Sequence, residues 1–390
     1  MEKINPVGIF PAPRYKDSGT TIFTVMSSMA QQYNAINLSQ GFPDFDADGR
    51  LGEFLLEACS HGFHQYAPMT GLPMLRNEVS EYIFSTQEVR VDEDAEITIT
   101  PGATSAIFTA FTSILQPGDE VIVFEPAYDS YIPNIEINGA RAVTIPLSAP
   151  DFSIDWNLVK DAISARTKAI ILTTPHNPTG ATLKPNDWNT LAELVRNTSI
   201  IIISDEVYEQ LVYDNEKHTG VLQHPELRRR AFAIYSFGKT FHITGWKIGY
   251  CIAPPVLTNA FRKIHQFLSF SVNTPAQYAL ARVLQQPPSQ PANILLQQKR
   301  DLFLSLLGDT PFTFHRPSAG SYFQLAGYSR ISNLPDYEFA AWLTKNHGVA
   351  AIPVSAFYRN RKDDKIIRFC FAKKDETLKS AGERLKNVVD

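Results

Sequence analysis

A lysine in a short glycine-containing turn is the residue of this sequence best suited to covalent chemistry. Lys239 lies in residues 236–240 (SFGKT) and follows the apolar run 231–237 (AFAIYSF). A lysine at the carboxyl end of a buried strand projects into the crevice where open α/β sheets bind ligands. An amine that is desolvated and near a second cation loses its proton readily and attacks carbonyl groups. Lys247, a little further along the chain, could supply that cation or bind phosphate.

Two other interpretations of Lys239 compete with this one. A lone lysine is usually a solvated surface residue. Residues 238–240 (GKT) also match the end of the phosphate-binding loop GxxxxGK[ST], but that pattern needs glycine where this chain has Ala233. Ala233 falls within an expected strand, where no loop could wrap a phosphate. A P-loop nucleotide hydrolase is therefore the least favoured function.

Asp205 ends a second apolar run, 200–204 (IIIIS). Its carboxylate is expected to emerge at the edge of a sheet, where a poorly solvated acid needs a cationic partner. The protonated ring nitrogen of a bound cofactor would serve. A helix N-cap at a strand–helix turn is the alternative, and aspartate is common there. The residue type and position support both interpretations equally.

Two turns rich in small residues follow other apolar runs. Residues 174–180 (TPHNPTG) follow 169–173 (AIILT), and their prolines and glycine fix Asn177 as a hydrogen-bonding group. Residues 100–105 (TPGATS) lead from 97–100 (ITIT) into an expected helix, whose first N–H groups and hydroxyls could bind an anion. An ordinary turn and an ordinary capped helix remain the alternatives.

Tyr128 and Arg368 complete the candidate set. Tyr128 follows the run 121–124 (VIVF), and its ring could stack on a flat ligand or simply fill the core. Arg368 is a charge inside the apolar segment 366–371 (IIRFCF). A buried arginine needs a partner, which could be a substrate carboxylate held by two hydrogen bonds or an internal acidic residue.

The elements that position these residues form an α/β pattern. The apolar runs lack polar alternation, which is typical of parallel strands buried on both faces. Expected helices at 103–115 and 187–196 separate them, so strands and helices alternate. After the Pro/Gln-rich segment 285–292, a helix at 294–307 and strands at 321–325 and 365–371 indicate a smaller α+β lobe.

Composition excludes several function classes. The 390 residues suffice for two lobes, and the net charge of −4 comes without a long charged run, so no nucleic-acid partner is expected. Three cysteines without CxxC spacing favour a reducing compartment, and neither a metal site nor a disulfide framework is expected. The first residues lack the apolar run of a signal peptide, and no segment has the apolar length of a membrane span. The sequence therefore predicts a cytoplasmic protein without a membrane partner.

Four motifs in order give the chain a specific resemblance. Residues 65–71 (QYAPMTG), 236–240, 244–250 (TGWKIGY) and 271–277 (SVNTPAQ) resemble class I/II aminotransferases, which are fold type I enzymes dependent on pyridoxal 5′-phosphate (PLP). The similarity is greatest to the kynurenine/glutamine and bacterial methionine transaminase branch. It implies a large domain, 41–284, with a mostly parallel seven-stranded sheet flanked by helices. A smaller α+β domain would comprise 1–40 and 285–390.

The resemblance also implies a role for each candidate residue. Lys239 would bond covalently to PLP and then carry protons as the catalytic residue. The other cofactor-binding residues would be Ala103, Thr104, Tyr128, Asn177, Asp205, Tyr208, Ser236, Lys247 and, from the neighbouring subunit of a homodimer, Tyr66. Substrate would contact Arg368, Asn177, Gly41, Phe23, Phe270 and Phe357.

These roles amount to ping-pong transfer of an amino group from an amino acid to a 2-oxo acid. The three phenylalanines favour large neutral donors, namely methionine, glutamine or aromatic amino acids. Two alternatives remain: cysteine-S-conjugate β-lyase activity at the same site, and a non-catalytic PLP-binding module. The second is disfavoured, because such modules are usually fused to a DNA-binding domain for which this chain has no spare residues.

Overall fold

The computed structural model describes residues 19–286, 290–314 and 316–389. The first 18 residues of the expected small domain, and residues 287–289 of the expected Pro/Gln-rich boundary, lie outside this range. None of the helices within the described ranges has the length and apolar character needed to cross a membrane.

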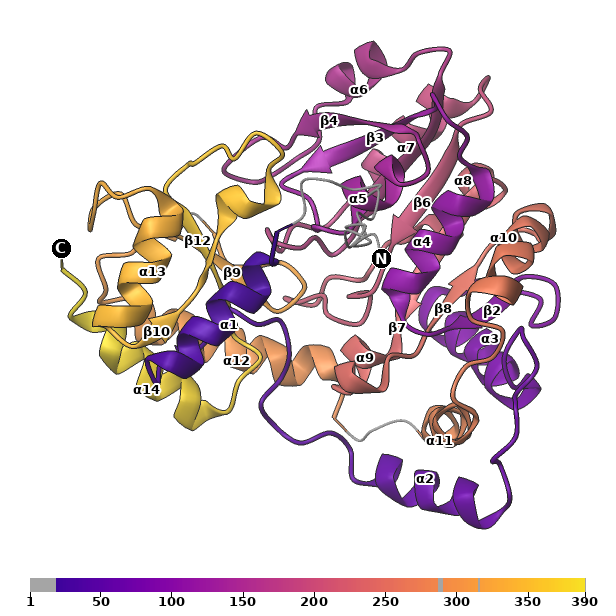
Figure 1. Ribbon diagram of the computed structural model, residues 1–390, viewed down its shortest axis with the longest axis horizontal. Helices are drawn as coiled ribbons and strands as arrows, with labels where there is room; N and C mark the ends of the chain where they lie inside the picture. The colour runs from indigo at the N-terminus through magenta and orange to yellow at the C-terminus, as the bar shows by residue number, and fades with distance from the viewer. Residues whose placement is uncertain (1–18, 287–289, 315, 390) are drawn as a thin grey trace, which may run out of the picture.

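A seven-stranded sheet forms the centre of the larger lobe (Figure 1). Its strand order is β2-β8-β7-β6-β5-β3-β4. Strand β8 pairs antiparallel with β2 and β7, whereas the other pairs are parallel. The strands are β2 (Ile97–Thr100), β3 (Glu120–Glu125), β4 (Arg141–Pro146), β5 (Thr167–Thr173), β6 (Ile201–Asp205), β7 (Ala231–Ser236) and β8 (Gly249–Ile252). The predicted, mostly parallel sheet is thus confirmed.

Helices cover both faces of this sheet, which explains the unbroken apolar runs. Within β5, Ile171 belongs to the apolar cluster that includes α4 (Ala103–Ile114). The neighbouring Ile170 belongs to the cluster that includes α7 (Pro185–Val195). One face carries α4 (Ala103–Ile114), α5 (Tyr131–Glu136) and α10 (Pro255–Leu268). The opposite cluster includes α2 (Arg50–Ser60), α3 (Pro73–Gln87), α6 (Trp156–Ala162), α7 (Pro185–Val195), α8 (Pro225–Arg228) and α11 (Thr274–Gln285). Successive strand residues therefore need apolar side chains on both faces.

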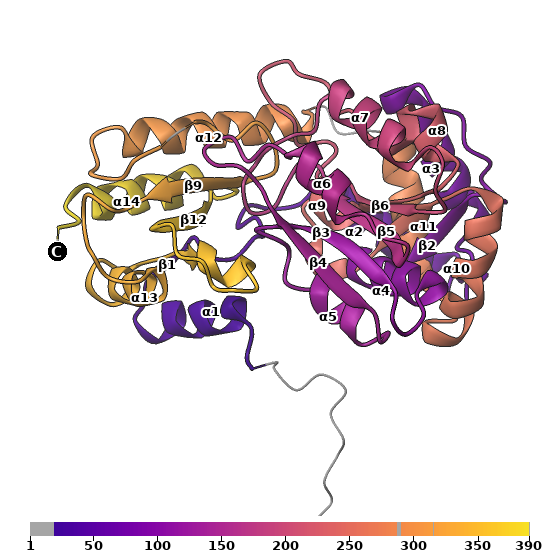
Figure 2. The ribbon, with the colours of Figure 1, turned by 90° about the horizontal axis from the view of Figure 1, so that it is seen from above.

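The second lobe contains a three-stranded antiparallel sheet, β11-β12-β9, and a parallel pair, β1–β10. Its strands are β1 (Ile36–Asn37), β9 (Phe323–Gly327), β10 (Val349–Ala350), β11 (Ile352–Pro353) and β12 (Ile366–Cys370). Its helices are α1 (Ile22–Gln32), α12 (Ala292–Leu307), α13 (Asp336–Asn346) and α14 (Asp375–Lys386). Helix α1 lies beside α13, so an N-terminal segment packs on the C-terminal part (Figure 2). The expected domain boundaries stay a prediction.

One expected strand begins two residues too early. The sequence pattern predicts a strand over 321–325, but β9 begins at Phe323. The prediction is wrong there because Ser321 has a φ of 62°, a left-handed conformation that ends extended backbone. This turn fixes the direction of Tyr322, which matters at the site below.

Candidate active site

A cavity of about 320 Å³ lies at the carboxyl ends of the large sheet's strands and is closed by residues of the second lobe. The large lobe contributes residues from the turns after β2, β3, β5, β6 and β7. Arg368 of β12 and Phe323 of β9 come from the second lobe. This is the edge at which open α/β sheets bind ligands.

Lys239 points into the cavity from a single helical turn, α9 (Phe237–Thr240), that directly follows β7. Its Nζ donates to the hydroxyl of Tyr322 at 2.9 Å and lies 3.5 Å from the carbonyl oxygen of Gly41. Burial lowers the pKa of Lys239 to about 8, and the nearby charge of Lys247 acts in the same direction. Roughly a tenth of the amine is therefore unprotonated at pH 7, far more than for an ordinary lysine, and this fraction can act as a nucleophile or base.

Asp205 is buried at the end of β6, and its carboxylate is held by a tyrosine. The Tyr131 hydroxyl lies 2.5 Å from Asp205 Oδ2 and donates to it, and it also lies 2.7 Å from the Thr173 hydroxyl. Burial raises the pKa of Asp205 to about 6, although the bond from Tyr131 opposes the rise. A carboxylate in this environment favours a cationic partner in the cavity.

The N-terminus of α4 and the amine of Lys247 form an anion-binding corner. Gly102, the N-cap of α4, has a φ of 84°. A Cβ atom placed there would lie 3.4 Å from Lys247 Nζ, so the amine stands directly over the helix start. Ala103, Thr104 and Ser236 also line the cavity. Free N–H groups, hydroxyls and a cation together suit a phosphate group.

Arg368 is buried in β12, and two of its nitrogens are already bonded. Nη1 donates to Asn177 Oδ1 at 2.7 Å, and Nη2 donates to the carbonyl oxygen of Ser39 at 2.9 Å. Its Nε is buried and has no hydrogen-bond partner among the residues that the structure describes. The guanidinium carbon lies 3.8 Å from the centre of the Phe323 ring. Burial lowers the pKa of Arg368 to about 10, which leaves it charged at neutral pH. A substrate carboxylate would compensate this charge.

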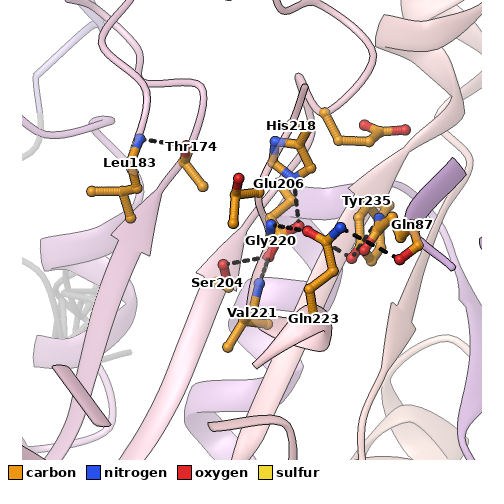
Figure 3. A network of polar contacts seen from close by, with 12 residues as sticks. Gln87, Thr174, Leu183, Ser204, Glu206, His218, Gly220, Val221, Gln223 and Tyr235 are labelled. Carbon is orange, nitrogen blue, oxygen red and sulfur yellow. Dashed lines mark hydrogen bonds and ion pairs between the residues drawn. The ribbon is translucent and has the colours of Figure 1, made fainter. Parts of the chain in front are cut away.

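Behind Asp205, Glu206 anchors a buried polar network (Figure 3). The Glu206 carboxylate has four partners within 3.2 Å: the Ser204 hydroxyl, the Val221 amide, the Tyr235 hydroxyl and His218 Nε2. Tyr235 also accepts from Gln87 Nε2, which extends the network to α3. The network fixes the backbone that continues from Asp205.

The structure brings most of the expected site residues together. Those that line the cavity are Phe23, Gly41, Ala103, Thr104, Tyr128, Asn177, Asp205, Tyr208, Ser236, Lys239, Lys247 and Arg368. Ala233, which stands where a P-loop would need glycine, lies inside β7, as expected when that motif was disfavoured.

Three expected residues lie outside the cavity of this chain. Phe357 is buried beside Arg368, with its ring centre 5.2 Å from the guanidinium carbon. Tyr66 is 80% exposed and Phe270 is 50% exposed, and their rings contact each other at 5.3 Å. Phe270 and Phe357 are thus absent from the cavity lining of the described chain, and their contact with substrate stays a prediction.

Sequence reasoning missed three residues that shape the site. Tyr131 lies three positions after Tyr128 in an aromatic turn, a signal that could have been followed. Phe323 and Tyr322 carry no local signal, since their place depends on the turn at Ser321. Among the described residues, no three His, Cys, Asp or Glu side chains form a group that could hold a metal ion.

Comparison with known proteins agrees with this geometry. Residues 33–385 match the model of the family "Aminotransferase class I and II". The methionine aminotransferase of Escherichia coli (strain K12) is 45% identical over 97% of this chain and 99% of its own. The human kynurenine–oxoglutarate transaminase 3 is 34% identical over 96% of this chain and 89% of its own.

Solved structures show the same fold. An Escherichia coli structure reported with a methionine aminotransferase function superposes with a TM-score of 0.95 at 46% identity, covering 97% of this chain and 99% of that one. The N-succinyldiaminopimelate aminotransferase of Mycobacterium tuberculosis gives a TM-score of 0.92 at 35% identity, covering 97% and 100%. The chain belongs to the class I and II aminotransferases and is a transferase of nitrogenous groups.

Proposed function

We propose that this enzyme binds PLP through Lys239 and transfers the α-amino group of a large neutral amino acid to a 2-oxo acid by a ping-pong mechanism. Methionine, glutamine and aromatic amino acids are the proposed donors. One observation carries the proposal: an amine with a lowered pKa, a buried carboxylate and a buried guanidinium line a single cavity. Each of these groups has a separate use in amino-group transfer.

The chemistry of the cavity fits PLP, on which this family depends. The N-terminus of α4 with Lys247 would hold the phosphate, and Asp205 would pair with the ring nitrogen. Tyr208 and Asn177 would bond the phenolic oxygen, and Tyr128 would stack on the ring. Support comes from the position of Lys247 over Gly102 and from the partial burial of Tyr128 at the cavity wall.

Three side chains of this cavity have separate roles in the proposed reaction. When bound, PLP supplies an electron sink that stabilises negative charge on the substrate's α-carbon. Lys239 takes the α-proton, because its amine is partly unprotonated near neutral pH, and returns a proton later. Asp205 stays charged above about pH 6 and keeps its cationic partner protonated. Arg368 binds the α-carboxylate and orients the bond that breaks.

The cavity composition supports a neutral side chain in the substrate. Its described lining contains three cations, and each has an assigned use: Lys239, Lys247 and Arg368. An acidic side chain would have no cation left, whereas Phe23 and Phe323 offer apolar surface. The similarity to a methionine aminotransferase supports the same substrate class.

A homodimer is the proposed assembly, with Tyr66 reaching the phosphate of the neighbouring subunit. The exposure of the Tyr66–Phe270 pair supports this, because large exposed aromatic groups mark surfaces that a partner covers. Loss of PLP affinity in Tyr66→Phe without loss of the dimer is the expected signature.

The test is the visible absorption spectrum of the purified protein before and after methionine is added, with Lys239→Ala as the control. Conversion of the lysine-bound PLP band to the pyridoxamine band, with release of the 2-oxo acid, supports transamination. Release of pyruvate and ammonia from a cysteine conjugate would reveal β-lyase activity. A PLP band that no amino acid changes points to a non-catalytic binding module. A wild-type protein that takes up no PLP overturns the proposal.

A further inference from the structure

The hydroxyl of Tyr322 joins the reactive lysine to the N-terminal segment. It accepts a hydrogen bond from Lys239 Nζ at 2.9 Å and lies 2.5 Å from the Gly41 carbonyl oxygen, to which it donates. The three residues come from separate parts of the chain: α9, the turn before β9, and the segment after β1. Tyr322 belongs to none of the sequence motifs that predict the site.

The Tyr322 ring is held in place independently of Lys239. The side chain is fully buried, and its ring lies 5.2 Å from the ring of Tyr208 and 4.8 Å from that of Phe323. Its carbonyl oxygen accepts from the Phe371 amide at 3.0 Å. The preceding turn is fixed by a bond from the Ser321 amide to the Leu211 carbonyl oxygen at 2.9 Å. The hydroxyl is therefore a preorganised partner that the lysine reaches.

The absence of a Cβ atom at Gly41 makes room for this arrangement. A Cβ atom at Gly41 would lie 2.8 Å from Phe323 Cζ and 3.4 Å from Tyr322 Cε2. Glycine thus allows the backbone carbonyl to approach the tyrosine closely enough for a 2.5 Å bond.

The direction of the hydrogen bonds determines the effect on the lysine. A phenol has one proton, and Tyr322 gives it to Gly41. Toward Lys239 the tyrosine can then only accept. An acceptor stabilises an ammonium more than a neutral amine, because charge-assisted hydrogen bonds are the stronger ones. Tyr322 therefore opposes the effect of burial on the charge of Lys239.

Other groups also bear on this amine. The titratable and charged side chains around it are Asp205, Tyr208, Tyr322, Lys247, Arg368 and Cys370. Among them, Tyr322 accepts a hydrogen bond of 2.9 Å from the Lys239 side chain. Tyr322→Phe removes this bond together with the bond to Gly41 and the interaction with the Tyr208 hydroxyl, and it keeps the ring.

We propose that Tyr322 is a positioning residue for Lys239, holding the amine at one place whenever it is not bonded to the cofactor. The proposal rests on the proposed role of Lys239. In that role the amine must alternate between bonded and free, and a free buried ammonium without a partner is costly. Tyr322 supplies the partner and returns the amine to the same place for each proton transfer.

The experiment measures the pH dependence of Lys239 acetylation in the full-length chain, followed by peptide mass spectrometry. It is run without PLP and again with pyridoxamine phosphate, and both conditions leave the amine free. Tyr322→Phe keeps the ring contacts and removes one oxygen. The matched control is Tyr328→Phe, which removes an equally buried hydroxyl that donates to the Leu334 carbonyl oxygen at 2.9 Å, away from the cavity.

The wild-type midpoint is expected near pH 8. In Tyr322→Phe it falls by about one pH unit, the size expected when an ammonium loses one hydrogen bond, and in Tyr328→Phe it stays unchanged. A midpoint that is the same in Tyr322→Phe and wild type overturns the proposal, as does an equal shift in both variants. Thermal unfolding of each variant checks that folded protein is compared. If the wild type takes up no PLP, the proposed function fails separately, because the labelling result does not depend on PLP.

Discussion

Arg368 Nη1 donates to Asn177 Oδ1 at 2.7 Å, which joins β12 of the second lobe to the turn after β5 of the large sheet. The bond fixes the plane of a guanidinium whose face packs on Phe323 at 3.8 Å. Its Nη2 is fixed as well, by the carbonyl oxygen of Ser39. The orientation of the arginine is therefore set before any substrate binds, and a substrate carboxylate gains from that preorganisation.

Replacing Arg368 with lysine is expected to lower kcat/KM for methionine by roughly 100-fold, equivalent to about 3 kcal/mol. Lysine keeps the charge but cannot bond Asn177, Ser39 and a carboxylate in one plane. Steady-state kinetics measure the change. Arg229→Lys, on an exposed side chain of the surface, is the control and should match the wild type. Equal loss in both variants would contradict a specific role.

The bond from Tyr131 to Asp205 leads to a prediction about pH. PLP affinity is expected to fall as pH drops through the pKa of Asp205, about 6, because the protonated acid no longer attracts a cationic ring nitrogen. Tyr131 stabilises the charged form, so Tyr131→Phe raises this pKa further. The loss of affinity should then begin about one pH unit higher.

Fluorescence titration with PLP between pH 5 and 8 measures this shift. Tyr328→Phe, which loses a hydroxyl bond outside the cavity, controls for the titration of PLP itself. An affinity profile for Tyr131→Phe that coincides with the control would show that the tyrosine does not tune Asp205.

Sequence reasoning located the groups that follow directly from a buried strand. Asp205 and Asn177 were placed correctly at the sheet edge because a parallel strand buried on both faces is recognisable by its unbroken apolar run. The carboxyl ends of such strands share one edge, so the residues after them meet. The same logic placed Lys239 after β7.

The site residues that the sequence did not predict depend on contacts between distant segments. Tyr322 points at Lys239 only because Ser321 adopts a positive φ, and that turn is held by the carbonyl oxygen of Leu211. Apolar pattern alone extended the strand through Ser321. The local sequence around Phe357 likewise does not show that this ring lies 5.2 Å from the Arg368 guanidinium carbon, because the two residues come from separate elements.

The Glu206 network behind Asp205 predicts a large stability effect from one histidine. Glu206 is fully buried, and His218 Nε2 lies 2.8 Å from its Oε2. His218→Leu removes one of the two hydrogen-bond partners of this buried oxygen, the other being the Tyr235 hydroxyl, so the free energy of unfolding should fall by about 2 kcal/mol. Urea denaturation measures it.

A double-mutant cycle identifies the source of that loss. Glu206→Gln combined with His218→Leu should cost less than the sum of the single variants, because both variants disturb the same buried hydrogen bond. His64→Leu, on an exposed histidine, is the control for the substitution itself. Additive effects at positions 206 and 218 would show that the two side chains are not coupled.

Gly102 and Gly118 allow the anion corner to be tested with a matched pair of alanine substitutions. Both glycines have a left-handed φ, 84° and 91°, so alanine should cost each about 1–2 kcal/mol of folding free energy. A Cβ atom at Gly118 meets nothing within 4 Å, whereas one at Gly102 lies 3.4 Å from Lys247 Nζ, at the start of α4. The methyl group of Gly102→Ala would narrow the corner where the proposed phosphate site combines this cation with the first N–H groups of the helix. We therefore expect the dissociation constant for PLP to rise about 10-fold in Gly102→Ala, the cost of one weakened charge-assisted hydrogen bond. The constant should stay unchanged in Gly118→Ala.

Equilibrium dialysis measures both dissociation constants. Equal affinities in the two variants would place the phosphate elsewhere in the cavity.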